Sequence, residues 1–261
     1  MWEERLTTNE QHPILRIGDT VHRPVDFWTP AVHSLLGYLA ARGLSAAPRV
    51  IGRDGDSREV LSFLPGQSGQ DGWKQVVSED GLRAFARLLR RYHDVVADFR
   101  PPADLEWSTG ARGLNPGDII CHGDFGPWNV VWQEGVPTGL LDWDMAHPAP
   151  PEHDILYALE YTAPFRDDEA AVTWHAFPTP PDRRRRVGVF LTAYGHPPIP
   201  HLAAKVAAMQ REVAQHEAYL AVRGVQPQAD LVEQGQLEEL ERRTRWSEEH
   251  GELFEAIGRR P

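Results

Sequence analysis

Apolar and polar residues alternate in two short stretches near the amino terminus. Residues 14–23, "ILRIGDTVHR", contain two such runs separated by Gly18-Asp19, and a Gly-Asp pair suits a tight hairpin turn. Residues 48–66 repeat the pattern, with a turn-forming Asp-Gly-Asp sequence at 54–56. Each stretch therefore predicts a β-hairpin.

A helical pattern separates these two hairpins. Over residues 29–42 the leucines recur at helical spacing, at positions 35, 36 and 39. Thr29 is suited to cap this helix, Pro30 to occupy its first turn, and Gly43 to end it. Residues 1–66 are thus expected to form a small β-sheet that carries one helix.

The remainder of the chain is predicted to be mainly helical. The turn-rich segment "PGQSGQDG", residues 65–72, is typical of a linker. Helical periodicity follows at 79–96, and long amphipathic stretches occur at 202–223 and 228–256. The basic cluster "PDRRRR", residues 181–186, is expected to open another helix, as either a solvated helix end or a phosphate site.

Composition places the chain among ordinary globular proteins. Of its 261 residues, 41% are hydrophobic and 25% are charged. This length is sufficient for one large domain or two small ones. No apolar run approaches the ~20 residues that span a bilayer, and the polar, acidic start is unlike a secretory signal. One cysteine, Cys121, allows no internal disulfide. We therefore expect a cytoplasmic protein without a membrane partner.

The charge balance argues against nucleic acid as a partner. The formal net charge is −11, whereas binding to nucleic acid needs basic surface to replace counterions. The basic side chains are almost all arginines, because Lys74 and Lys205 are the two lysines of the sequence. This bias matters for any site that would ordinarily use a lysine. The sequence gives no indication of the oligomeric state.

The stretch "CHGDFGPWN", residues 121–129, carries the most distinctive candidate chemistry. Asp124 and Asn129 flank a Gly-Pro turn, and a short apolar hairpin leads from there to Asp142 and Asp144. Phosphoryl transfer needs this set of groups: one carboxylate accepts the proton of the attacking hydroxyl, while an amide oxygen and a second carboxylate hold Mg²⁺ against the phosphates.

These motifs resemble the aminoglycoside phosphotransferase family, small-molecule kinases related to choline and homoserine kinases. "HGDFGPWN" is similar to the family's catalytic loop, and "LLDWDMA" to its metal-binding segment. The resemblance implies an α+β, protein-kinase-like fold with two lobes. It places a small, β-rich nucleotide-binding lobe at 1–66. A larger, mainly helical lobe at 67–261 would hold the catalytic loop, the metal site and the acceptor pocket.

The resemblance also implies roles for the motif residues. Asp124 would be the catalytic base, and Asn129 and Asp142 would bind Mg²⁺. His122 would hold the loop by hydrogen bonds rather than transfer protons. Asp144 would reach a second metal or the acceptor, or cap the following turn.

Asp154, in "PEHDILYAL", matches a family aspartate that supports the catalytic loop from the start of a helix. A plain helix cap is the alternative, because aspartate is favoured at that position in any helix.

The first lobe departs from the family pattern. The family usually pairs a lysine on the third strand with a glutamate on the following helix, and neither lysine of this chain lies in that lobe. Arg23 would take the lysine's place, with Arg16 as the alternative, and His33 stands where the helix glutamate is expected. Arginine keeps the charge but differs in reach and geometry.

Further residues of the nucleotide site are predicted from their place along the first lobe. Thr7, Thr8 and Asn9 would cover the phosphates, because no Gly-rich loop precedes the first hairpin. "LSFLPG", residues 61–66, would be the hinge whose backbone groups near Ser62 and Leu64 bind adenine.

The acceptor pocket is expected in the second lobe. Its candidate residues are Asp144, Glu152, Tyr157, Glu160 and Trp174. The acids suit an amine-bearing alcohol, and the aromatic rings suit a cation or a flat substrate.

Together these features predict an enzyme that moves the γ-phosphate of ATP or GTP to a hydroxyl of a small molecule, with Mg²⁺ as cofactor. One alternative is a kinase-like protein that binds a nucleotide or metabolite without turnover. Another is a metal-dependent hydrolase that uses Asp142, Asp144 and His122.

Overall fold

The hairpins predicted near the amino terminus form one antiparallel sheet of five strands. The computed structural model describes residues 3–7 and 13–254. Its strand order is β1-β2-β3-β5-β4, so the two predicted hairpins lie side by side. The strands are β1 (Glu3–Arg5), β2 (Leu15–Ile17), β3 (Thr20–Arg23), β4 (Val50–Arg53) and β5 (Glu59–Ser62). The sequence pattern did not indicate β1, which is three residues long and exposed.

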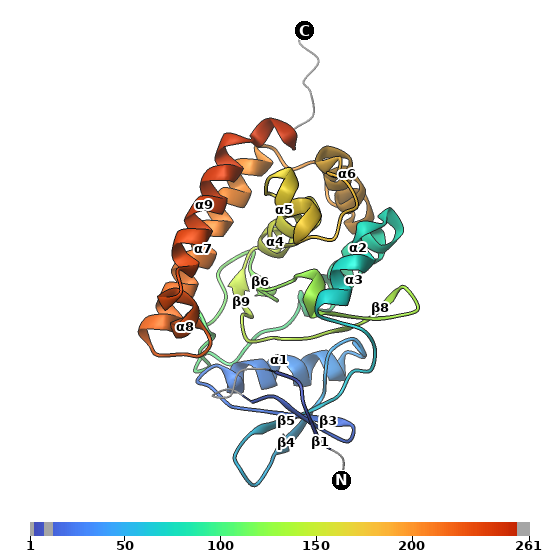
Figure 1. Cartoon of the computed structure of the whole chain (residues 1–261). Helices are drawn as coiled ribbons and strands as arrows, with labels where there is room; N and C mark the ends of the chain where they lie inside the picture. Colours follow the sequence, from blue (N-terminus) through green and yellow to red (C-terminus); the bar gives the residue numbers. More distant parts are fainter. Residues whose placement is uncertain (1–2, 8–12, 255–261) are drawn as a thin grey trace.

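The helix α1 (Thr29–Ala41) connects the two hairpins and lies on the side of the sheet that faces the helical region (Figure 1). Its apolar face is buried, as the leucine spacing predicted. Thr29 is not the cap, because the helix already includes it and Trp28 precedes the first turn. The Thr29 hydroxyl instead accepts a hydrogen bond from the Asp26 N–H at 2.8 Å.

The rest of the described chain is mainly helical (Figure 1). Its helices are α2 (Gln70–Val77), α3 (Glu79–Val96), α4 (Glu152–Thr162), α5 (Asp168–Thr173), α6 (Arg183–Tyr194), α7 (Leu202–Val222), α8 (Gln228–Glu233) and α9 (Gln236–Glu249). α3 packs against α6, and α7 packs against α9. One hydrophobic core runs from α1 through α3 into these helices, with Leu35, Phe85 and Phe190 fully buried.

Two predicted segments differ from the sequence expectation. The linker at 65–72 is shorter, because α2 begins at Gln70 and buries Gly72 and Val76. The stretch at 228–256 is broken at Gly235, whose φ of 94° suits glycine, into α8 and α9. Residues 255–256 of that stretch lie outside the described residues.

The basic cluster at 181–186 opens α6 as predicted, but it is not simply a solvated helix end. Arg183 and Arg186 are buried, and Arg186 donates to the carbonyl oxygens of Thr162, Val77 and Val76. These carbonyls end α4 and α2, where a cation is favourable. Arg186 therefore joins the ends of two helices.

Two small antiparallel pairs lie between the large sheet and the helices. β6 (Ile119–Cys121) pairs with β9 (His147–Ala149), and β7 (Val130–Gln133) pairs with β8 (Val136–Leu140). The β7–β8 pair is the short hairpin predicted after the loop, and its turn lies near Glu134-Gly135. These strands place the residues between them, 122–129 and 141–146, beside one another.

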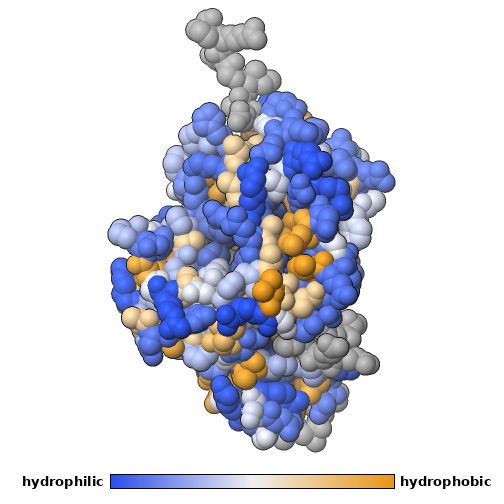
Figure 2. Space-filling view, turned by 90° about the vertical axis from the view of Figure 1, so that its left-hand side faces the viewer, coloured by the Kyte–Doolittle hydropathy of each residue, from blue (hydrophilic) through white to orange (hydrophobic). Residues whose placement is uncertain are grey.

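The surface on the side of α7, α8 and α9 is largely hydrophilic, with hydrophobic residues in small separate patches (Figure 2). No helix in the described part of the chain is long and apolar enough to cross a membrane.

Candidate active site

The loop after β6 makes a sharp turn that requires glycine. Gly123 has a φ of 78°, and a Cβ atom there would lie 2.0 Å from the backbone oxygen of Met145. The loop ends in a short 3₁₀ helix, η1 (Pro127–Asn129), which leads directly into β7. The turn at Gly123 thus brings the loop into contact with the segment that follows β8.

Asp154 holds this loop from the first turn of α4. Its two carboxylate oxygens accept the N–H groups of His122 at 2.8 Å and Gly123 at 2.9 Å. His93 of α3 donates to the same carboxylate at 3.0 Å, and Tyr194 lies behind His93. Burial alone would raise the pKa of Asp154, but the hydrogen bond from His93 and the neighbouring histidines hold it well below its usual range.

The Asp154 side chain therefore bonds to the loop. Sequence reasoning did not find His93, because nothing in the α3 pattern separates it from an ordinary core histidine.

His122 is fully buried, and both of its ring nitrogens are engaged. Nε2 donates to the Leu141 carbonyl at 2.9 Å, and Nδ1 accepts the Asp124 N–H at 3.3 Å. Burial lowers the pKa of His122 to about 4, so the ring is neutral near pH 7. This geometry joins the loop to the segment after β8 and leaves neither nitrogen free for proton transfer.

Three hydrogen-bond donors contact the carboxylate of Asp124. Tyr157 donates its hydroxyl to Oδ1 at 2.5 Å, and the Asn129 amide donates to Oδ2 at 2.7 Å. The Trp128 indole approaches Oδ2 at 3.4 Å. Burial, helped by the charge of Asp142, raises the pKa of Asp124 to about 7. A carboxylate with a pKa near neutrality is suited to accept a proton at that pH.

Asn129 and Asp142 offer the oxygen ligands of a hard cation. Because the Asn129 amide nitrogen donates to Asp124, its oxygen is left as an acceptor. Asp142 has a φ of 56°, an uncommon conformation that for an aspartate stores some strain. Desolvation in the cleft and the charge of Asp144 raise the pKa of Asp142 to about 6.

This donor set fits Mg²⁺ that is shared with phosphate. Among the described residues, no group of three or more His, Cys, Asp or Glu side chains is placed to hold a metal ion. Mg²⁺ commonly takes one or two carboxylates and completes its shell with phosphate oxygens and water. Asn129 and Asp142 would supply the protein's share.

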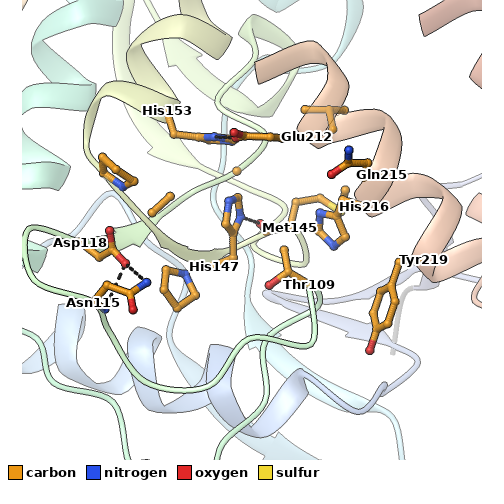
Figure 3. Close-up of a pocket in the computed structure, with 15 residues that line it drawn as sticks. Thr109, Asn115, Asp118, Met145, His147, His153, Glu212, Gln215, His216 and Tyr219 are labelled. Carbon is orange, nitrogen blue, oxygen red and sulfur yellow. Dashed lines mark hydrogen bonds and ion pairs between the residues drawn. The ribbon is translucent and has the colours of Figure 1, made fainter. Parts of the chain in front are cut away.

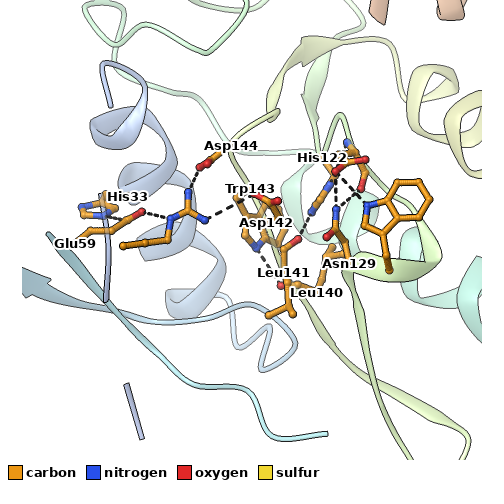
Figure 4. Close-up of polar contacts among 12 residues, drawn as sticks. His33, Glu59, His122, Asn129, Leu140, Leu141, Asp142, Trp143 and Asp144 are labelled. Carbon is orange, nitrogen blue, oxygen red and sulfur yellow. Dashed lines mark hydrogen bonds and ion pairs between the residues drawn. The ribbon is translucent and has the colours of Figure 1, made fainter. Parts of the chain in front are cut away.

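Asp144 pairs with an arginine of the large sheet. Its carboxylate accepts a hydrogen bond from Nη2 of Arg23, whose Nη1 lies 3.8 Å from Asp142 (Figure 4). The structure thus shows Asp144 in an ion pair between the sheet and the segment after β8, which was not among the roles expected from the sequence. Arg16 has its guanidinium 3.6 Å from the centre of the Phe63 ring and, like Arg23, lines the cleft between the sheet and the catalytic loop.

A cleft of about 590 Å³ separates the sheet from the catalytic loop. Arg23, Ser62 and Leu64 line it from the sheet side, and Asn129 and Asp142 line it from the loop side. It has the size and the mixed apolar and polar lining of a small-molecule site. Thr7 also lines this cleft, whereas Thr8 and Asn9 lie outside the described residues.

A second cleft, of about 400 Å³, opens on the other side of Asp124 and Asp142. Tyr157 and Asp144, two of the residues named above as candidates for an acceptor pocket, line it. Glu217 of α7 also lines it, and burial raises the pKa of that carboxyl. The sequence did not point to Glu217, because it lies in an amphipathic helix 93 residues beyond Asp124.

Three predicted acceptor residues lie elsewhere, which corrects the expectation. Glu152 forms an ion pair with Lys205 at 2.8 Å. Glu160 is buried against Arg243, because its position on α4 turns it toward α9. Trp174, at the end of α5, is 77% exposed and lines neither cleft among the described residues.

A third cleft, of about 460 Å³, lies beside Gly123 and Met145 (Figure 3). His147, His153 and His216 face it from β9, α4 and α7. Burial lowers the pKa of His147 and of His216 to about 4. This surface is therefore polar but carries neutral imidazoles from these two residues near pH 7.

The family is decided by comparison with known proteins. The model of the phosphotransferase enzyme family, APH, matches residues 4–117 and 114–187. The chain belongs to this family. The catalytic loop of this phosphotransferase family member and, apart from Glu3, its large sheet fall within the matched residues.

One curated relative is the trifolitoxin immunity protein of Rhizobium leguminosarum bv. trifolii. It is 37% identical over 171 residues, which are 64% of this chain and 64% of the relative. The match therefore spans less than two thirds of the relative's own length.

Solved structures confirm the fold. The complex of amicoumacin kinase hAmiN with AMP-PNP, Ca²⁺ and Ami has a TM-score of 0.59 at 14% identity, covering 95% of this chain and 88% of that one. The GDP complex of aminoglycoside 2'-phosphotransferase-IIIa has a TM-score of 0.58 at 15% identity, covering 97% and 93%. The expected α+β, protein-kinase-like architecture is thus present, whereas the lobe boundary after residue 66 stays a prediction.

Proposed function

We propose that the protein transfers the γ-phosphate of ATP or GTP to a hydroxyl group of a small molecule. The observation that carries the proposal is the meeting of two clefts at Asp124, Asn129 and Asp142. The first cleft would hold the nucleotide, with Ser62 and Leu64 at the adenine end and Arg23 at the phosphates. The second would hold the acceptor, with Asp124 between it and the nucleotide.

The roles of the chain's residues follow from their contacts. Asp124 would orient the acceptor hydroxyl and take its proton as the oxygen attacks the γ-phosphorus and the bond to the leaving diphosphate breaks. Tyr157 and Asn129 hold that carboxylate in place. Asp154 and His122 would keep the loop in register, because their hydrogen bonds fix its backbone.

Asn129 and Asp142 would hold Mg²⁺, which neutralises charge on the transferring phosphate when bound. The amicoumacin kinase structure is a complex with AMP-PNP and Ca²⁺, which supports the use of a nucleotide together with a divalent cation here. A cytoplasmic location, where nucleoside triphosphates are available, is part of this proposal.

The acceptor would be an amine-bearing alcohol, an aminoglycoside-like compound or another amino alcohol. Carboxylates of Asp26, Asp144 and Glu217 line its cleft together with the rings of Trp128 and Tyr161. Such a lining favours cationic groups through charge and through the aromatic faces.

A second candidate function is protection against a toxic small molecule. The curated relative is named as an immunity protein for trifolitoxin. Protection could follow from phosphorylation of the toxic compound, or from binding it without turnover as a kinase-like protein.

The test begins with thermal unfolding of the purified protein in the presence of ATP or GTP, with and without Mg²⁺. A ligand that binds the folded state raises the unfolding temperature. We expect an increase that depends on Mg²⁺, followed by a phosphorylated product with an amine-bearing alcohol in mass spectrometry.

Binding without product from any alcohol would favour the non-catalytic alternative. Phosphate release from a phosphomonoester without a nucleotide would favour the hydrolase alternative. No change in unfolding temperature with either nucleotide would contradict the proposal.

A further inference from the structure

Glu59 is a buried carboxylate that faces the nucleotide cleft from the large sheet. It is the first residue of β5, it pairs directly across the sheet with Arg23 of β3, and it is 2% exposed. Its Oε1 lies 2.7 Å from Nε of Arg23, and its Oε2 accepts a hydrogen bond from Nε2 of His33 at 2.6 Å (Figure 4). Both carboxylate oxygens are therefore engaged, which offsets the cost of burying the charge.

The guanidinium of Arg23 contacts two parts of the molecule. Nε faces Glu59 within the sheet, while Nη2 contacts Asp144 and Nη1 lies 3.8 Å from Asp142 across the cleft. A guanidinium is planar and rigid, so fixing its Nε edge also fixes the direction of its two terminal nitrogens. Glu59 therefore sets the direction in which Arg23 meets the site proposed for metal and phosphate.

We propose that Glu59, held in place by His33, is a positioning residue that orients Arg23 toward the phosphates of the nucleotide. This inference rests on the proposed function. The family usually pairs a lysine with a glutamate from the following helix, and the sequence placed Arg23 and His33 at those two positions. Here an arginine takes the lysine's position, the carboxylate comes from the neighbouring strand, and the helix contributes His33 as the donor that holds it.

The geometry also explains why a helix glutamate is not needed. His33 and Glu59 together link α1 to β5 and β3, so the chain of contacts from helix to phosphate-binding cation is kept with different residues. A lysine at position 23 would offer a single nitrogen where the arginine offers three. It would lose either the contact with Glu59 or the reach toward Asp142.

The test measures affinity for a non-hydrolysable analogue of ATP or GTP with Mg²⁺ by titration calorimetry. The proteins are the wild type, Glu59→Gln, Arg23→Gln and the double variant, and thermal unfolding without nucleotide reports on their folding. Glu79→Gln is the matched control, because Glu79 also binds two basic side chains, Arg83 and Arg185, but lines neither cleft.

We expect Glu59→Gln to weaken analogue binding about tenfold, the usual size for a lost charged hydrogen bond. In the Arg23→Gln background the same change should cause no further loss, since Glu59 acts through Arg23. Glu79→Gln should leave affinity unchanged. Losses that multiply in the double variant would overturn the inference, because they would indicate a general distortion of the sheet.

His33→Gln covers the case in which Glu59→Gln fails to fold, since it leaves the pair between Arg23 and Glu59 intact. We expect it to fold and to weaken binding about threefold, as for a partly lost hydrogen bond; unchanged affinity would contradict the inference. If the wild type binds neither analogue, the proposed function fails and this inference fails with it. If the wild type binds and Glu59→Gln binds equally well, only the inference fails.

Discussion

The catalytic loop and the five-stranded sheet line the same cleft, yet they are assembled in different ways. The loop takes nearly all its groups from residues 121–129, and Asp142 joins them from the end of the next hairpin. The sheet brings together Arg23, His33 and Glu59 from β3, α1 and β5. A continuous loop shows its chemistry as a spacing in the sequence. Where side chains from different strands meet, other residue types can supply the same charges, so no fixed spacing marks them in the sequence.

The two regions also differ in their electrostatics. On the loop side the pKa of Asp124 is raised to about 7 and that of Asp142 to about 6. On the sheet side, burial alone would lower the pKa of Arg23, but the carboxylates of Asp144, Asp142 and Glu59 raise it above its ordinary value. The sheet thus supplies a fixed positive charge to a cluster of acids. This comparison predicts that loop variants alter turnover, whereas sheet variants alter nucleotide affinity.

The largest effect is expected for Asp124→Asn. It removes the group proposed to take the acceptor's proton and should lower the turnover number about 1,000-fold, within the range for a lost general base. Affinity for the Mg²⁺–nucleotide complex should stay nearly the same, because Asn129 and Asp142 are unchanged. Steady-state kinetics and calorimetry separate the two effects. Asp56→Asn, in the exposed turn of the second hairpin, is the control, and equal turnover in both variants would disprove the assignment of the base.

Gly123→Ala tests whether the loop depends on its turn. The added Cβ atom would lie 2.0 Å from the Met145 oxygen at a φ that disfavours alanine. We expect the free energy of unfolding in urea to fall by about 3 kcal/mol. Gly135→Ala has a similar φ of 75° but open space around its Cβ, so it should cost only about 1 kcal/mol. Equal losses would mean that backbone strain, and not contact with Met145, makes Gly123 necessary.

Asp154→Asn tests the support beneath the loop. The aspartate carboxylate accepts hydrogen bonds at two oxygens, whereas the asparagine amide accepts at one. The amide therefore cannot accept both backbone N–H groups and the His93 hydrogen bond, and a buried donor loses its partner. We expect a loss of about 3 kcal/mol in the free energy of unfolding. Asp167→Asn, which changes an exposed cap of α5, should cost almost nothing because asparagine caps equally well. A loss near zero for Asp154→Asn would show that it is a plain helix cap.

The smallest expected effect is a difference in the pH dependence of stability between a buried and an exposed histidine of the helical region. Burial lowers the pKa of His175 to about 3, against about 6.5 in an unfolded chain. Below pH 6.5 the unfolded state therefore binds more protons than the folded state. The free energy of unfolding keeps its full value above pH 6.5 and falls as the pH is lowered toward 3. Relative to His175→Gln, the wild type should lose about 1.4 kcal/mol per pH unit in that interval.

Urea unfolding between pH 7 and pH 4.5 measures this difference. His201→Asn, which changes an exposed histidine, serves as the control and should show the same pH dependence as the wild type. Parallel profiles for the wild type and His175→Gln would rule out the buried neutral state of His175.

Much of the fold could be predicted because its signals are local. The hairpins at 14–23 and 48–66 and the helix at 79–96 follow from alternation, turn residues and helical spacing, which act within a few residues. The predictions that failed depend on distant partners. α2 forms inside a turn-rich segment because it packs on the catalytic loop, and Arg186 is buried because it binds two helix ends far away in the sequence.

For the candidate site, the sequence alone determined the loop 122–129 and the acids at 142 and 144, since their chemistry depends on a short, fixed spacing. Only the tertiary structure decided which carboxylate faces Arg23, which acid of α7 lines the cleft proposed for the acceptor, and which histidine holds Asp154. Glu59, Glu217 and His93 are ordinary residues of a strand and two helices until the fold brings them to the site. The physical reason is that ion pairs and buried hydrogen bonds act through space, and the spacing of residues along a chain does not encode such contacts.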